Sequence, residues 1–398
     1  MEQVWFTAAI WLGLALIATL LSIWLRVSVA LTEITVGMVA QLVVAGIAGP
    51  GALGAREGWI AFLAGLGAMV LTFLAGAELD PDSFRRNWKE ATVIGLVGFF
   101  APFLGATWAA RALLGWGVQA SLLAGVALST TSVAVVYAVL LELGLNRTAY
   151  GKIILAACFI NDLGTVVALG LIFAPFTLRS LAFVVGLGAG LAVLVRATGA
   201  LFGRYGGRTS ELEAKHLLFG LFVLGGLAVW SGSEAVLPAY LIGMVLAGTV
   251  GRDQALVRRL RTLTFGLLTP FYFIRAGSFV DVPAVVAGLG VFTVLFLAKA
   301  VSKFVGIFPL TRRYGYPHNE GMYTTLLMST GLTFGTIAAL YGLSHDIITQ
   351  KQYSFLVATV IASAVVPTWV ANKFFLPVRH LPSEEARDPQ DALTAEPE

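Results

Sequence analysis

The sequence places an amide and an acid side by side in the middle of an apolar run. Asn161 and Asp162 lie in the stretch "IILAACFINDLGTVVALG", which is otherwise almost entirely apolar for two helical turns on either side. A helix of this length crosses a membrane, and its midpoint is about twelve residues from each surface at ~1.5 Å per residue. A short acidic side chain cannot reach water from that depth, so the pair is a candidate ion or proton site.

A buried carboxylate can bind either a proton or a cation. Burial disfavours the charged form of an acid, whereas a nearby positive charge favours it. A carboxylate held between these two effects can exchange one ion for the other, and we therefore interpret Asp162 as an ion carrier. The alternative is a structural Asp in a permanent ion pair.

Three basic residues also lie within apolar runs. Lys299 is near the middle of the run 284–308, where we expect it to pair with Asp162 or, alternatively, with backbone carbonyls of an interrupted helix. Lys303 is one turn further on and is expected to extend its ammonium group to the membrane surface. Arg275 keeps its proton, so it is either a fixed counter-charge for the site or a structural residue near the end of its helix.

Two polar clusters lie about half a chain apart, in "ALSTTSVAVVYAV" and "LLMSTGLTFGTIAAL". Paired interrupted segments in corresponding halves are typical of transporters built from inverted repeats, whose broken helices expose backbone groups to an ion. The alternative is that small and hydroxyl residues only allow close helix packing. The ion-binding candidates are Thr130, Thr131 and Ser132 in the first cluster, and Ser329, Thr330, Gly331 and Thr333 in the second, with helix breaks near 129–132 and 329–336.

The elements that must position these residues are membrane helices. The chain has 398 residues, of which 58% are hydrophobic and 12% charged, compared with about 45–50% and 25% in soluble domains. Apolar runs fill the region 1–378, which we interpret as one all-α membrane domain. The predicted spans are 4–25, 30–48, 58–76, 91–113, 118–142, 150–174, 177–197, 215–231, 233–250, 260–280, 284–308, 319–343 and 352–378.

Thirteen spans place the two termini on opposite sides of the membrane. Short cytoplasmic loops are enriched in Lys and Arg. With the C-terminus inside, most of the 26 basic residues lie at cytoplasmic helix ends, and only Arg56, Arg111, Arg179 and Lys351 lie at the other side. The sequence therefore predicts a plasma-membrane protein with its N-terminus outside. This topology accounts for the net charge of +4 without a nucleic-acid partner. The polar tail 379–398 is expected to be disordered.

Other side chains that could do chemistry receive structural interpretations. Glu33, Glu78 and Asp80 lie near predicted cytoplasmic helix ends, where acids are usually solvated or cap the helix; otherwise they would line a cation entrance. The single cysteine, Cys158, is expected to be a small buried hydrophobe. The four histidines lack metal-ligand spacing, and the sequence has no nucleophile elbow, phosphate loop or dinucleotide motif. We therefore expect no cofactor and regard a membrane enzyme as the weaker alternative.

The motifs and their order resemble the monovalent cation/proton antiporter superfamily, in the branch of NapA-type sodium/proton and Kef-type potassium/proton antiporters. The resemblance rests on "FLAGLGAMVLTFLAGAELDP", "STTSVAVVYAVLLELGLNRTAYGKIILAACFINDLGT", "LPAYLIGMVLAG", "TPFYFIRAG", "LAKAVSKFVG" and "STGLTFGTIAALYGL". It implies a homodimer with a dimerisation part and a core that moves like an elevator, with two broken helices crossing at the ion site. It also implies that Asp162 binds both cation and proton, and that Lys299 pairs with the position before it.

That preceding position is Asn161, whereas electrogenic members of the family have a second Asp there. Asn161 is neutral and can only form hydrogen bonds, so the resemblance implies electroneutral exchange of one proton for one Na+ or K+. It also implies a role in pH homeostasis. Lys299 is retained without its usual partner and could itself carry a proton. The alternatives are a sodium-coupled organic-anion symporter of similar architecture, or a channel-like or non-transporting membrane protein.

Overall fold

The computed structural model describes residues 2–25, 27–49, 53–77, 81–173, 177–207, 211–233, 235–251 and 253–380. Glu78, Asp80 and the tail from 381 onward lie outside the described residues. The described part consists of helices without strands: α1 Glu2–Leu25, α2 Val29–Ala48, α3 Gly58–Ala77, α4 Pro81–Trp108, η1 Ala109–Leu113, α5 Val118–Ser129, α6 Val133–Glu142, η2 Leu145–Arg147, α7 Ala149–Ile172, α8 Leu178–Tyr205, α9 Leu212–Trp230, α10 Val236–Leu246, α11 Gln254–Leu263, η3 Thr264–Leu268, α12 Thr269–Ser278, α13 Val282–Ala287, α14 Leu289–Arg313, α15 His318–Met328, α16 Thr333–Ser344, α17 Gln350–Phe374 and η4 Val378–His380.

Each predicted span corresponds to one helix or to two or three consecutive helical elements. Within the described residues, ten helices are long and apolar enough to cross a membrane, and Val29–Val44 and Val236–Leu246 are shorter apolar helices. The remaining predicted span, 260–280, is covered by α11, η3 and α12, and begins earlier than expected at Gln254. The span expected at 284–308 is divided at Gly288 into the short α13 and the long α14.

Two of the predicted spans are interrupted in the middle. α5 ends at Ser129 and α6 begins at Val133, while α15 ends at Met328 and α16 begins at Thr333. Thr130 and Ser132 have extended backbone conformations, and the Ser132 hydroxyl accepts from the amide of Val135 at the start of α6. Hydroxyl side chains compete for backbone hydrogen bonds and so favour helix ends over helix interiors.

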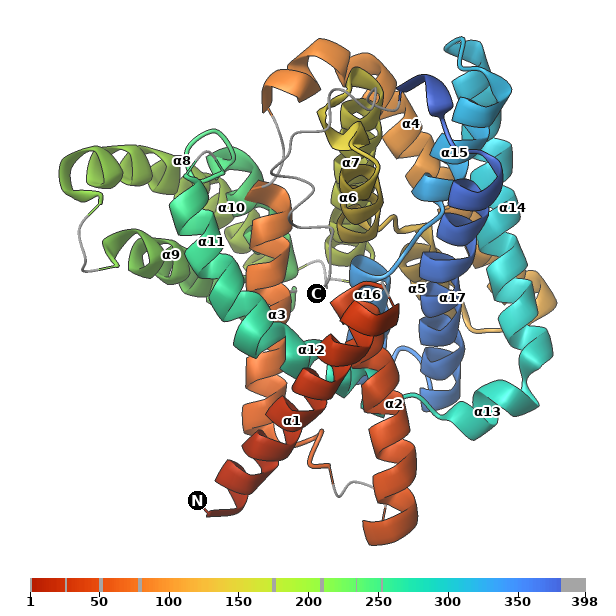
Figure 1. Cartoon of the computed structure of the whole chain (residues 1–398). Coiled ribbons are helices and arrows are strands. Elements are labelled where there is room, and N and C mark those ends of the chain that lie inside the picture. The colour runs from red at the N-terminus through yellow and green to blue at the C-terminus, as the bar shows by residue number, and fades with distance from the viewer. Residues whose placement is uncertain are drawn as a thin grey trace.

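Packing divides the helices into two groups. The first contains α1, α2, α3 and α8 to α12, and the second contains α4 to α7 and α14 to α17. Contacts are dense within each group, whereas direct contact between the groups is mainly that of α10 with α7. In Figure 1, α3 and α8 to α11 lie on the left, and α14, α15 and α17 lie on the right.

Glycines bring the helices that carry the polar residues close together. α3 and α10 cross where Gly76 and Gly243 each lie against the backbone of the other helix, so that an added Cβ would collide with it. In the second group, a Cβ at Gly95 of α4 would lie 2.7 Å from the carbonyl oxygen of Ala157 in α7. Backbone approach of this kind is typical of membrane helix interfaces. At Gly95 it holds α4 close to α7, the helix that carries Asp162.

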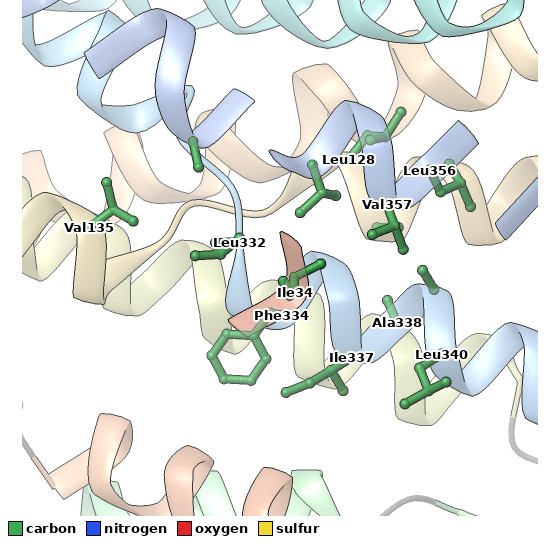
Figure 2. Close-up of a cluster of buried hydrophobic side chains, with 14 of the residues drawn as sticks. Ile34, Leu128, Val135, Leu332, Phe334, Ile337, Ala338, Leu340, Leu356 and Val357 are labelled. Carbon is green, nitrogen blue, oxygen red and sulfur yellow. The ribbon is translucent and has the colours of Figure 1, made fainter. Parts of the chain in front are cut away.

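Apolar side chains surround the interruptions. Figure 2 shows Leu128 at the end of α5, Leu332 in the extended segment before α16, and Phe334 and Ile337 in α16, with Leu356 of α17 nearby. All of these side chains belong to one buried cluster. The polar backbone of the two interruptions is therefore enclosed by hydrocarbon and must find its hydrogen-bond partners inside the protein.

Candidate functional site

The two extended segments cross and are joined directly. The Ser132 amide donates to the Thr330 carbonyl at 3.0 Å, and the Thr131 hydroxyl donates to the Met328 carbonyl at 2.7 Å. These bonds satisfy backbone carbonyls that the end of α15 leaves without helical partners. The crossing thus brings together two polar clusters that are about 200 residues apart in the sequence, as the resemblance implied.

Two lysines of α14 reach this crossing from one side. The Lys299 ammonium donates to the Thr130 carbonyl at 3.3 Å, and the Lys303 ammonium donates to the Thr131 hydroxyl at 2.9 Å. Both side chains are fully enclosed, with exposed fractions of 1% and 0%. Positive charge is favourable next to the carbonyl end of a helix, so both lysines complement the end of α5.

The geometry of Lys303 differs from our expectation. We expected its ammonium at the membrane surface, but the side chain is buried and interacts electrostatically with Asp162. Lys299, which was expected to pair with Asp162 or with backbone carbonyls, bonds to the Thr130 carbonyl, the second of these alternatives. A lysine one helical turn nearer the membrane surface can reach that surface only if no other segment covers it. Here the crossing segments cover Lys303.

Asn161 and Asp162 are buried in α7 with exposed fractions of 0% and 1%. Among the described residues, both polar atoms of the Asn161 amide and the Oδ1 atom of Asp162 have no hydrogen-bond partner. A Cβ at Gly98 of α4 would lie 3.4 Å from Asn161 Nδ2 and 3.3 Å from Met328 Cε, so this glycine keeps α4 close to the amide. Buried polar atoms without partners are rare and call for an explanation, and two of these three are oxygens suited to a hard cation.

Two further side chains lie beside Asp162. Cys158, one turn before it on α7, is buried with its Sγ 3.5 Å from Met328 Sδ. Tyr240 of α10 is fully buried beside Asp162 and donates its hydroxyl hydrogen to the Phe159 carbonyl at 2.9 Å. The spacing of Cys158 and Asp162 could have indicated the first, but nothing in the sequence pairs Tyr240 with α7.

The remaining candidates of the second cluster support the crossing. A Cβ added to Gly331 would collide with the Lys299 ammonium and lie 2.8 Å from the Thr130 hydroxyl. The Ser329 hydroxyl donates to the Thr325 carbonyl and the Thr330 hydroxyl to the Leu327 carbonyl, both within their own helical turn. Thr333 is the first residue of α16 and is half-buried.

Arg275 lies apart from these residues. Its Nε donates to the Ala55 carbonyl at 2.8 Å, and its guanidinium carbon lies 4.9 Å from the centre of the Phe279 ring. The acid expected near a helix end, Glu33, is instead buried in α2 with an exposed fraction of 1%. Among the described residues there is no cluster of three or more His, Cys, Asp or Glu side chains that could hold a metal.

Two interrupted membrane helices that cross beside a buried carboxylate define a class of secondary transporter. Comparison with known proteins makes the assignment more specific, because the model of the family described as "Sodium/hydrogen exchanger, transmembrane" matches residues 12–373. The chain belongs to this family. The predicted all-α membrane fold and the resemblance to cation/proton antiporters are therefore confirmed.

Individual relatives agree with this assignment. The chain is 25% identical over 382 residues to "Probable Na(+)/H(+) antiporter 3" of Methanocaldococcus jannaschii, covering 90% of this chain and 95% of the relative. It is 27% identical over 351 residues to "Cation/H(+) antiporter 15" of Arabidopsis thaliana, covering 82% of this chain but only 42% of the plant protein. The chain thus spans nearly the whole archaeal relative and less than half of the plant one.

A solved structure supports the fold independently. The sodium proton antiporter MjNhaP1 from Methanocaldococcus jannaschii, in its structure at pH 8, superimposes with a TM-score of 0.69 over 94% of this chain and 100% of that chain. The sequence identity is 15%, so this likeness concerns the fold alone.

Proposed function

We propose that the protein exchanges a monovalent cation, Na+ or K+, for a proton, and that Asp162 binds the two in competition. The observation that carries the proposal is the enclosure of Asp162 in α7 beside the crossing of two interrupted helices, where the buried Lys303 interacts with it electrostatically. The orphaned oxygens of Asp162 and Asn161 are candidate ligands for the ion. Thr130, Thr131 and Ser132, with the carbonyls of the segment from Ser329 to Thr333, would complete an oxygen-rich shell.

Competition accounts for coupling. A deprotonated Asp162 without a cation adds a charge to the interior, and such a charge is costly to move across a hydrophobic barrier. Only the protonated or cation-loaded carboxylate would cross readily, so each transfer of a cation in one direction requires return with a proton. The second helix group would then move relative to the first, as in an elevator.

Asn161 limits how much charge one cycle moves. A neutral amide cannot release a proton, which leaves Asp162 as the carboxylate that titrates at this position. Lys303 is fixed by its bond to Thr131 and by Asp162, and Lys299 by its bond to the Thr130 carbonyl. We therefore propose electroneutral exchange, in which Asp162 gains and loses the one proton that is exchanged for the cation.

The remaining parts of the proposal concern assembly and location. The region 1–378 would form the antiporter domain of a homodimer in the plasma membrane, with the N-terminus outside and the C-terminus in the cytoplasm. The membership in the exchanger family favours antiport over the organic-anion symporter and over a channel.

The proposal is tested with purified protein in liposomes that carry an internal pH-sensitive dye. Addition of Na+, Li+ or K+ in turn to liposomes with an acidic interior should release protons only for the transported cations. A channel would pass the cation without moving protons, and a symporter would require an organic anion. Either result, or no proton movement with every cation, would contradict the proposal.

A further inference from the structure

A cavity of about 630 Å³ lies between the two helix groups and is separate from the Asp162 site. Its walls come from α3, α9, α10 and α12 of the first group and from α16 of the second. Most of the lining side chains are Ala, Gly, Leu, Phe and Val, and the polar ones include Arg275, Tyr272 and Ser344. The volume is in the range of about 300–1,000 Å³ that is typical of small-molecule sites.

The charged end of the cavity lies where membrane helices end. Arg275 is in the last turn of α12, and Ser344 is the last residue of α16. Beside the cavity, α9 ends at Trp230, an exposed residue whose ring lies 5.5 Å from the Arg179 guanidinium carbon. Trp and Arg at helix ends are typical of the headgroup level of a membrane, so Arg275 lies near that level.

Arg275 is a cation without a carboxylate partner within the described part of the chain. The ion pairs recorded there are Arg259 with Glu211 and His380 with Glu320. Arg275 itself uses its Nε for the Ala55 carbonyl. The rest of its planar guanidinium group has further N–H donors, in a geometry that suits two phosphate oxygens.

The apolar part of the cavity has open space at two glycines. A Cβ built on Gly65 of α3 or on Gly226 of α9 would meet no atom within 4 Å. Close by, the exposed rings of Phe62 and Phe222 stack with centroids 6.5 Å apart, joining α3 to α9 at the membrane-facing surface. A hydrocarbon chain fits this apolar environment.

From these features we propose that the cavity binds an anionic phospholipid of the surrounding membrane, with its phosphate on Arg275 and one acyl chain between α3 and α9. The charge of Arg275 selects an anionic headgroup over a zwitterionic one. Because α16 lines the cavity with α3, α9 and α12, the lipid contacts both helix groups at once. This site goes beyond cation/proton exchange and does not depend on it.

The test is lipid binding to the detergent-solubilised, delipidated protein, measured by native mass spectrometry and by thermal stability in the absence of any ion gradient. Phosphatidylglycerol should bind more tightly than phosphatidylcholine. Arg275→Gln should lose that preference, with about tenfold weaker phosphatidylglycerol binding, as expected for loss of charged hydrogen bonds. Gly226→Leu should weaken binding of both lipids, because its side chain occupies the acyl-chain space.

A matched control is Gly199→Leu in α8, which also meets no atom within 4 Å but lies outside the cavity lining. It should bind lipid like the unmodified protein. Equal affinity of the unmodified protein for the two lipids would overturn the proposal, as would unchanged binding in Gly226→Leu. A preference that survives Arg275→Gln would overturn the assignment of the headgroup. Since no transport is measured, these results are independent of whether the protein exchanges ions.

Discussion

The Lys303 ammonium donates a 2.9 Å hydrogen bond to the Thr131 hydroxyl, which in turn donates to the Met328 carbonyl at 2.7 Å. One lysine is thereby joined to both interrupted helices while it interacts with Asp162. The charge of Asp162 and the geometry of the crossing are coupled through this single side chain. A change in the ion bound at Asp162 would therefore be felt by both interrupted helices.

Removal of the lysine charge tests this coupling. In Lys303→Gln, Asp162 loses its compensating charge, so protons compete better with cations and half-maximal exchange should move to higher pH. Loss of a buried charge partner also costs about 3–5 kcal/mol of folding stability when no water or ion replaces it. Exchange at several pH values and thermal unfolding in detergent measure the two effects.

Lys299→Gln provides the comparison for that prediction. Lys299 bonds to the Thr130 carbonyl, and Asp162 is not among its recorded interactions. Its replacement should reduce stability with a much smaller movement of the pH profile. Equal displacement of the two profiles would argue against Lys303 as the principal partner of Asp162.

Conversion of Asn161 to Asp tests how charge movement is set. The new carboxylate would lie next to Asp162 and can release a second proton, so Asn161→Asp should make exchange sensitive to an imposed membrane potential. The unmodified protein should be insensitive. Currents on solid-supported membranes measure this directly, and a clear current from the unmodified protein would refute the electroneutral assignment.

The Tyr240 hydroxyl joins the two helix groups by its bond to the Phe159 carbonyl. If the groups move relative to each other, this bond must break in every cycle. Tyr240→Phe should therefore alter the exchange rate while it costs only about 0.5–1.5 kcal/mol of stability. Stopped-flow exchange rates and unfolding midpoints, taken on the same preparation, separate the two effects.

Tyr150 supplies a matched control within one group. Its buried hydroxyl bonds to the Glu320 carbonyl and to the Thr324 hydroxyl, both in α15 of the same group as α7. Tyr150→Phe should lower stability without a comparable effect on rate. The idea of moving groups would be weakened if Tyr150→Phe changed the rate as much as Tyr240→Phe.

Gly331 tests the packing of the crossing. A methyl group there would displace the Lys299 ammonium and crowd the Thr130 hydroxyl. Gly331→Ala should destabilise the protein by about 1–3 kcal/mol, the usual cost of overpacking. Gly199→Ala, at a position with open space in α8, should leave the thermal unfolding midpoint unchanged or raise it, because Ala favours helix over Gly; a fall as large as that of Gly331→Ala would contradict this account.

Much of the fold could be predicted from the sequence because a membrane helix is recognisable from its own apolar composition. Apolar runs marked the spans, and the hydroxyl residues near Thr131 and Thr330 marked both interruptions. Helix edges were less accurate where a helix continues through charged residues, as at Arg258 and Arg259 just before the predicted span 260–280. The basic residues there lie on a helix that begins at Gln254.

The site was less predictable because it depends on contacts between distant segments. Periodicity places Lys303 on the same face as Lys299, but it does not show that the crossing of α5 and α15 covers that face. Tyr240 likewise lies near Asp162 because α10 packs against α7, a contact between segments far apart in the sequence. Such relations require the folded chain, whereas the depth of Asp162 could be read from its run alone.

The central claim is that one carboxylate alternates between proton and cation. For a single shared site, the cation concentration for half-maximal exchange should rise about tenfold for each unit that pH falls, once Asp162 is mostly protonated, since a ligand must be deprotonated to bind. The most direct measurement is proton release from liposomes with Asp162→Asn beside the unmodified protein. The account predicts no coupled exchange from the variant, with thermal unfolding confirming that it is folded. Coupled exchange by folded Asp162→Asn would contradict it.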